Sequence, residues 1–281
     1  MKIGLEALAY FTVHDYKDGL RKMKSHGYDC VDYSEICNPN CEPFGWSDAE
    51  YEKYLREVGE EAQQVGVEIT QIHGLWPTDD RFCKQREKDL RLFEKQIRGA
   101  YYLGCKKMVV HPVMPYGWGS ELDKDKVWEL NIERYKRLTQ YAEKYDVTVC
   151  TENMPFTAYD TSRTKALKEL IKEIDHPLFK MCLDTGHANV CREDIAEDVR
   201  LLGDDLVALH VHDNKGNWDQ HLIPYQGNIK WEEFLAALKE IGYKGCFTLE
   251  TCVSRNTPEP VREEMRLSLA HLARSMADKC E

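Results

Sequence analysis

Eight short apolar and β-branched segments recur about every 26–40 residues along this 281-residue chain, and this spacing constrains its fold more than any other feature. The stretches between them have the 3.6-residue apolar periodicity of helices that bury one face. Strand and helix are therefore predicted to alternate along the whole chain. The predicted strands are Lys2–Leu8, Cys30–Ser34, Val67–Ile72, Lys107–Val110, Val147–Thr151, Phe179–Leu183, Leu206–Val211 and Cys246–Leu249.

Local signals mark the ends of the predicted helices. Ser47, with Glu50 three residues later, has the pattern of a capping box at a helix start. Glycines that follow a helical run and precede a strand are typical helix terminators. They are Gly27, Gly66, Gly104 and Gly242.

Strand–helix units of this length, with no linker and no low-complexity stretch, predict the α/β class. The architecture that we expect is a (β/α)8 TIM barrel, formed as a single domain by residues 1–281. An open doubly wound sheet is the alternative. It is disfavoured because the phosphate-binding pattern G-x-G-x-x-G does not follow the first predicted strand.

Composition and charge exclude several classes of protein. The chain has 49 acidic and 38 basic residues, a formal net charge of −11, which argues against a nucleic-acid partner because that affinity rests on Lys and Arg. No apolar run approaches the ~18 residues of a membrane span. The N-terminus lacks the apolar core of a signal peptide. Eleven cysteines at irregular spacings favour a reducing, cytoplasmic location over a disulfide framework.

Carboxylates and imidazoles gather at the C-terminal ends of the predicted strands, where TIM barrels place their chemistry. Six of the ten histidines lie there. Like charges from several strands would face one another at this rim unless a cation lay between them. Carboxylate oxygen and imidazole nitrogen together suit Mn²⁺, Zn²⁺, Co²⁺ or Mg²⁺. The rim residues are Glu35, His73, His111, Glu152, Asp184, His187, His210, His212, Asp219, His221 and Glu250.

Each of these residues taken singly also has a structural explanation. A strand-end histidine can bond to backbone, and Asp184 can cap the turn that follows it. Strand alternation places His210 and His212 on one face, so that one or both could bind a metal. Aromatic residues after the second to fourth strands either wall a ligand pocket or pack in loops. These are Phe44, Trp46, Trp76, Tyr116 and Trp118.

Five short motifs stand in order at or near consecutive strand ends. They are TEN around Glu152, CLDTGH from Cys182 to His187, HVHDN from His210 to Asn214, QGNIKW before a helix, and TLE ending at Glu250. In this ordered set the chain resembles the xylose isomerase-like TIM-barrel superfamily, over essentially the whole barrel. That superfamily holds sugar isomerases, ketose 3-epimerases, inosose dehydratases and the endonuclease IV DNA-repair enzymes.

The resemblance to the epimerases implies one divalent metal ion, with Mn²⁺ as the first choice. The implied ligands are Glu152, Asp184, His210 and Glu250. His210 is preferred to His212 because the family's ligand histidine stands three residues before an acidic residue, here Asp213.

The implied chemistry is proton transfer on a small sugar or polyol. The metal polarises the sugar carbonyl, and Glu152 and Glu250 move a proton through an enediolate. Substrate contacts are expected from His187, His212, His73, His111, Trp118 and Trp46.

The resemblance to endonuclease IV implies a different site, in which three zinc ions hydrolyse a phosphodiester. Its nine candidate ligands are His73, His111, Glu152, Asp184, His187, His210, Asp219, His221 and Glu250. Residues 34–52 hold no Lys or Arg, which argues against DNA as the substrate. A metal-dependent lyase or dehydratase acting on a keto-sugar, and a non-catalytic sugar-binding barrel, are the further alternatives. A homo-oligomer is compatible with all of them.

Overall fold

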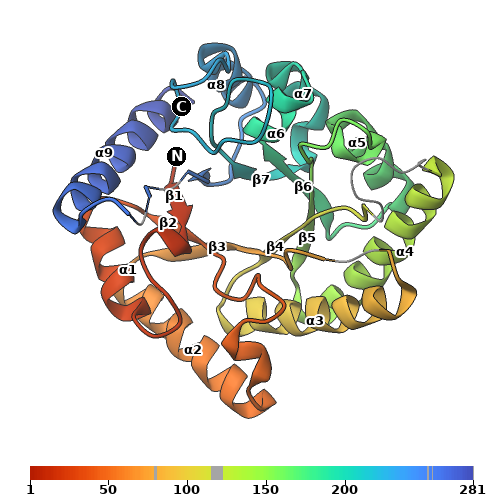
Figure 1. Ribbon diagram of the computed structural model, residues 1–281, viewed down its shortest axis with the longest axis horizontal. Helices are drawn as coiled ribbons and strands as arrows, with labels where there is room; N and C mark the ends of the chain where they lie inside the picture. The colour runs from red at the N-terminus through yellow and green to blue at the C-terminus, as the bar shows by residue number, and fades with distance from the viewer. Residues whose placement is uncertain (79–80, 115–122, 252, 255, 281) are drawn as a thin grey trace.

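The computed structural model describes residues 1–78, 81–114, 123–251, 253–254 and 256–280. Eight parallel strands form one curled sheet at the centre of the molecule, with helices around it (Figure 1). The order of the strands in the sheet is β7-β6-β5-β4-β3-β2-β1-β8. Their bounds are β1 Ile3–Glu6, β2 Cys30–Tyr33, β3 Glu68–His73, β4 Lys107–Val110, β5 Thr148–Glu152, β6 Phe179–Asp184, β7 Leu206–His210 and β8 Phe247–Leu249.

The two outer strands of this order meet, and the barrel closes there. A parallel bridge joins Val211 to Leu249. The N–H of Val211 donates to the Thr248 carbonyl at 2.9 Å, and the N–H of Glu250 donates to the Val211 carbonyl at 3.0 Å. The predicted (β/α)8 barrel is thereby confirmed, and the open doubly wound sheet is excluded.

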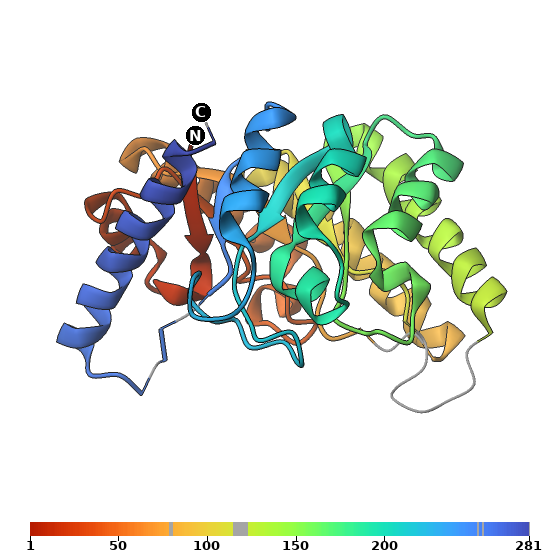
Figure 2. The same cartoon turned by 90° about the horizontal axis from the view of Figure 1, so that it is seen from above.

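Helices follow the strands around the outside of the barrel, and both termini lie at the end where the strands begin (Figure 2). The α-helices are α1 Tyr16–Ser25, α2 Asp48–Val65, α3 Cys83–Tyr102, α4 Lys124–Ala142, α5 Thr164–Ile174, α6 Thr185–Val190, α7 Ile195–Leu202, α8 Trp231–Glu240 and α9 Glu259–Asp278. Short 3₁₀ turns are Ala7–Ala9, Glu42–Gly45, Glu143–Tyr145, Asp160–Ser162 and Gly203–Asp205.

The predicted helix ends are confirmed. The Glu50 N–H donates to Ser47 Oγ at 3.3 Å, and the Ser47 N–H donates to Glu50 Oε2 at 3.0 Å, which completes the capping box of α2. The four terminating glycines all have left-handed backbone, with φ between 62° and 91°. The predicted first strand ends early, because Ala7 begins a 3₁₀ turn.

The described helices leave no membrane-spanning candidate, because none of them combines the necessary length with a sufficiently apolar stretch.

The barrel interior holds a small apolar cluster that is separate from the main core. Its four members come from the neighbouring strands β4 to β7 and are fully buried: Val109, Cys150, Cys182 and Ala208. Because side chains two residues apart in a strand point to the same face, each member has a polar residue above it at the barrel mouth. Those residues are His111, Glu152, Asp184 and His210. The fold therefore sets a layer of functional side chains on a dry, apolar floor.

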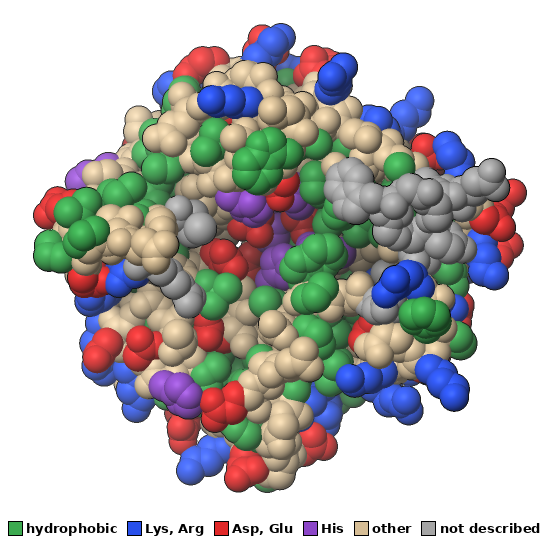
Figure 3. All heavy atoms as spheres, in the orientation of Figure 1, with side chains coloured by type: hydrophobic (Ala, Val, Ile, Leu, Met, Phe, Trp, Pro, Cys, Tyr) green, Lys and Arg blue, Asp and Glu red, His purple; other side chains and the backbone are tan. Residues whose placement is uncertain are grey.

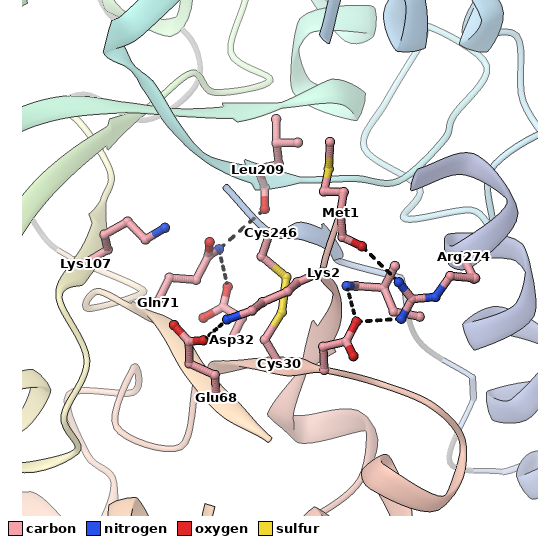
Figure 4. The surroundings of a disulfide bond; sticks show 12 residues. Met1, Lys2, Cys30, Asp32, Glu68, Gln71, Lys107, Leu209, Cys246 and Arg274 are labelled. Atoms are coloured by element: carbon pink, nitrogen blue, oxygen red, sulfur yellow. Dashed lines mark hydrogen bonds and ion pairs between the residues drawn. A yellow bond between two sulfur atoms is a disulfide. The ribbon is translucent and has the colours of Figure 1, made fainter. Parts of the chain in front are cut away.

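One disulfide, Cys30–Cys246, joins the first residue of β2 to the residue before β8 (Figure 4). It passes β1 at Gly4, where a Cβ atom would lie 2.9 Å from Cys30 Sγ. The irregular cysteine spacing favoured free thiols over a disulfide framework, and this pair departs from that expectation. A pairing across 216 residues leaves no local signal in the sequence. Eight other described cysteines are free, and five of these are buried as small packing residues.

Two carboxyl groups are shielded from water, one within α7 and one shortly before it. Asp198 is buried, and Glu193 is half-buried with Oε2 3.5 Å from the Thr164 N–H. Burial, together with the charge of Asp198, raises the pKa of Glu193 to about 8. Burial, together with Asp194 and Glu197, raises the pKa of Asp198 to about 7.

Folding stability is expected to fall as these two groups lose their protons. Their pKa values are higher in the folded than in the unfolded protein. Their contribution to the free energy of unfolding is therefore fully present below about pH 4 and is lost as the pH rises to about 8. In urea unfolding across this range, the double variant Glu193→Gln, Asp198→Asn should lose less stability than the wild type. An equal pH dependence in both proteins would contradict this assignment.

Candidate metal centre at the barrel mouth

Imidazoles and carboxylates line the central hollow of the barrel mouth (Figure 3). They form groups in which one potential ligand atom of each residue lies within 4.8 Å of the others. Three of these groups account for ten of the predicted rim residues. The groups are His73, His111 and Glu152; then Glu152, Asp184, His210 and Glu250; then His187, His212, Asp219 and His221.

The central group contains the four residues predicted as ligands of a single metal. His210 Nδ1 lies 2.6 Å from Glu152 Oε1 and 3.5 Å from Glu250 Oε2. Glu152, Asp184 and His210 are fully buried, whereas the Glu250 side chain is 13% exposed. The last strand therefore contributes the carboxylate that is most accessible from the mouth.

Asp184 caps the helix that follows it, and its second carboxylate oxygen faces an imidazole. Its Oδ1 accepts the His187 N–H at 2.6 Å and caps α6. Its Oδ2 lies 3.0 Å from His212 Nε2. Asn153 holds this turn in place, because its side chain bonds both the N–H and the carbonyl of Asp184 at 2.8 Å.

The group that contains His73 and His111 lies on the β3–β4 side of the mouth. His111 Nε2 lies 3.0 Å from Glu152 Oε2, and the two imidazole centroids are 5.0 Å apart. His73 Nδ1 donates to the Gly74 carbonyl at 2.8 Å, which fixes the orientation of the ring. Trp76, which precedes a cis proline, lies 4.9 Å from the His111 ring and forms an aromatic wall there.

The third group is built around Asp219 in the loop after β7. Asp219 Oδ2 is 3.3 Å from His187 Nε2 and 3.0 Å from His221 Nε2. The opposite nitrogens are held by backbone, since His187 Nδ1 donates to the Asn153 carbonyl and His221 Nδ1 to the Glu250 carbonyl. The His212 and His221 rings stack at 4.1 Å. Such anchoring of one ring nitrogen is typical of metal-binding histidines.

The loop that carries Asp219 and His221 is fastened at its base by Asp213. This buried carboxylate accepts four hydrogen bonds. The donors are the N–H groups of Asn214, Gly227 and Ile229 at 2.8, 2.9 and 3.3 Å, and the Trp231 indole at 3.0 Å. The H-x-x-D spacing therefore links His210 of the site to Asp213, which anchors the loop.

The carboxylates of the central group have strongly perturbed pKa values. Burial would raise the pKa of Glu152, but the His210 charge and hydrogen bonds from His111 and His210 hold it well below its usual range. Burial is similarly outweighed at Asp184, where His187 and His212 lower the pKa to about 2. Burial raises the pKa of Glu250 well above normal, and the charges of Asp184 and Glu152 add to this rise.

Three imidazoles balance these carboxylates. Burial opposes their charge, but the acidic neighbours, Asp184 foremost for His187, raise the pKa of His187 to about 10. Asp219 and Glu250 raise that of His221 to about 11. The pKa of His210 is also well above normal. Ring protons thus supply positive charge where a divalent cation would supply it, and metal binding would release such protons. The donor set fits an ion that accepts oxygen and nitrogen ligands.

Other predicted residues lie apart from these groups. Trp46 packs on Tyr54 of α2 with ring centroids 5.1 Å apart, so its contact with substrate stays a prediction. Trp118 and Tyr116 lie outside the described residues. Sequence reasoning missed Asp32, whose carboxylate lies 2.7 Å from His210 Nε2. Its one signal was a charged residue inside the apolar segment CVDY of β2.

Comparison with known proteins agrees with this fold. Residues 20–272 match the family described as xylose isomerase-like TIM barrel. The chain belongs to this family.

Relatives in the family include characterised and uncharacterised proteins. The uncharacterised protein MJ1311 of Methanocaldococcus jannaschii is 28% identical over 254 residues, covering 89% of this chain and 83% of the relative. A D-psicose 3-epimerase of Ruminiclostridium cellulolyticum is 27% identical over 247 residues, covering 85% and 79%. Among solved structures, the IolI protein with a bound zinc atom shares the fold at a TM-score of 0.80 and 19% identity, covering 100% of this chain and 99% of that one.

The close approach of Gly186 to His212 gives a test of the site geometry. A Cβ atom at position 186 would lie 1.9 Å from His212 Cε1, and the His212 ring is fully buried. Gly186→Ala should displace this ring and cost about 1–3 kcal/mol of unfolding free energy. Gly45→Ala is the matched control, because a Cβ there meets nothing within 4 Å. Unchanged stability and histidine NMR signals in Gly186→Ala would refute the described packing.

Proposed function

We propose that this protein is a divalent-metal-dependent epimerase or isomerase of a small sugar or polyol. The observation that carries the proposal is the central group, in which glutamates from β5 and the end of β8 lie on either side of His210. The sugar epimerase among the relatives supports the same reaction class.

Glu152, Asp184, His210 and Glu250 would hold the ion, for which we propose Mn²⁺, with Zn²⁺, Co²⁺ or Mg²⁺ as alternatives. A bound divalent cation polarises a substrate carbonyl and acidifies the neighbouring C–H.

The two glutamates are the proposed proton carriers. Glu152 lies 2.6 Å from His210 Nδ1 through Oε1 and 3.0 Å from His111 Nε2 through Oε2, whereas Glu250 Oε2 lies 3.5 Å from His210 Nδ1. In the proposed reaction one glutamate removes the proton from carbon and the other returns a proton. Return to the opposite face of that carbon gives the epimer, and return to the adjacent carbon gives the isomer.

Aromatic and imidazole groups around the mouth are the proposed substrate contacts. Trp76 covers His111, and His187 and His212 approach Asp184 from α6 and from the residues after β7. These rings offer both stacking surface and hydrogen-bond donors to sugar hydroxyls.

Glu152→Gln and Glu250→Gln should each abolish solvent-proton exchange at substrate carbon, by about 10²-fold or more, because a carboxamide cannot accept the proton. The measurement is NMR-detected deuterium incorporation into a panel of ketoses in D₂O. Glu129→Gln, on the exposed face of α4, is the control and should keep full exchange. Deuterium uptake that persists in both site variants would rule out the two-glutamate mechanism.

A second candidate function, phosphodiester hydrolysis at a cluster of three zinc ions, is favoured by the two groups on either side of the central one. The net charge of −11 and residues 34–52, without Lys or Arg, argue against a DNA substrate.

Metal content separates the two candidates. For the epimerase we expect about one ion per chain after purification without chelator, and His221→Ala should leave this number unchanged. Elemental analysis measures both proteins. Two or three zinc ions per chain, with loss of one in His221→Ala, would instead establish the zinc cluster and displace the epimerase proposal.

A further inference from the structure

Asp32 is a buried carboxylate in the barrel interior that the mechanism above does not use. It lies in the middle of β2 and is 1% exposed. In the sheet it pairs with Glu6 of β1 on one side and with Gln71 of β3 on the other. Both neighbouring strands therefore fix its position, below the level of the mouth.

Two donors converge on one oxygen of this carboxylate. Asp32 Oδ2 lies 3.0 Å from Gln71 Nε2 and 2.7 Å from His210 Nε2. The same Gln71 amide lies 3.4 Å from the carbonyl of Leu209, the residue before His210 (Figure 4). Gln71 thus joins the carboxylate to the strand that carries the imidazole.

This contact determines which nitrogen of His210 keeps its proton when a cation occupies the central group. The Gln71 amide also donates to this oxygen, so Asp32 Oδ2 is the acceptor and His210 Nε2 is the donor. The other nitrogen, Nδ1, then faces Glu152 Oε1 at 2.6 Å and Glu250 Oε2 at 3.5 Å. A cation held by the central group would meet that nitrogen as its ligand.

We propose that Asp32 is a positioning residue that sets the tautomer and ring orientation of His210 for binding a divalent cation. The inference rests on the proposed metal-dependent function. His73, His187 and His221 donate a ring N–H to backbone carbonyls, whereas His210 donates to a charged group. A carboxylate in this position strengthens the imidazole as a ligand, and loss of such a partner typically lowers metal affinity about 10–100-fold.

The surroundings of Asp32 make a purely structural role unfavourable. Its side chain is 1% exposed, and the apolar cluster Val109, Cys150, Cys182 and Ala208 lies in the same barrel interior. A buried charge destabilises a protein unless it is paired and hydrogen-bonded. The pairing with the His210 and Gln71 donors satisfies that requirement and directs the His210 ring toward the mouth.

The test is a titration of chelator-treated full-length protein with Co²⁺, followed by absorption spectroscopy and calorimetry. Asp32→Ala removes the acceptor and should weaken Co²⁺ binding about 10–100-fold. Asp32→Asn keeps an acceptor oxygen without the charge and should lose less affinity. Thr248→Val is the matched control, because Thr248 is fully buried in the barrel and its hydroxyl has no partner among the described residues.

Two further measurements separate a positioning role from a loss of folding. Thermal unfolding of each metal-free variant establishes that it is folded. Long-range ¹⁵N NMR of the histidines in the Zn²⁺-loaded proteins should show a proton on His210 Nε2 in the wild type and a changed tautomer in Asp32→Ala.

The outcomes discriminate this inference from the proposed function. If wild type and Asp32→Ala bind Co²⁺ equally and show the same His210 tautomer, this inference fails while the metal site stands. A wild type that binds none of Co²⁺, Mn²⁺ and Zn²⁺ overturns the proposed function and this inference together.

Discussion

Parallel strand register, combined with the alternation of side chains, is the constraint on which the rest of this molecule depends. It places a buried apolar layer inside the barrel and a charged layer two residues further along the same strands. Because the lower layer excludes water, every charge above it needs a partner close by. The network of imidazole–carboxylate pairs at the mouth follows from that requirement.

Much of this arrangement could be predicted from the sequence, because its signals are local. Apolar segments of strand length indicated the eight strands, and the capping box at Ser47 marked the start of α2. Once a barrel is assumed, a residue that follows a strand must lie at the mouth. The strand ends placed Glu152, His210 and Glu250 at the same rim, and the family resemblance implied that they form one group.

The features that sequence reasoning missed depend on the register between strands. Asp32 stands inside an apolar segment, and only the pairing of β2 with β3, shifted between Val31 and Asp32, shows that it faces Gln71. Its contact with His210 joins residues 178 positions apart. The same argument holds for the disulfide between Cys30 and Cys246. No local pattern in the sequence encodes such distances.

The anchoring of the loop after β7 has a consequence for how such a barrel can diversify. Asp213 fastens both ends of the segment between β7 and α8, so the part that carries Asp219 and His221 can vary while its base stays in place. The four residues of the central group come from β5 to β8 and their ends, and none of them lies in that segment. Exchanging this loop would therefore change two of the four members of the third group, Asp219 and His221, while His187 and His212 stay on the scaffold. The loop is thus a module through which one scaffold can acquire a different chemistry.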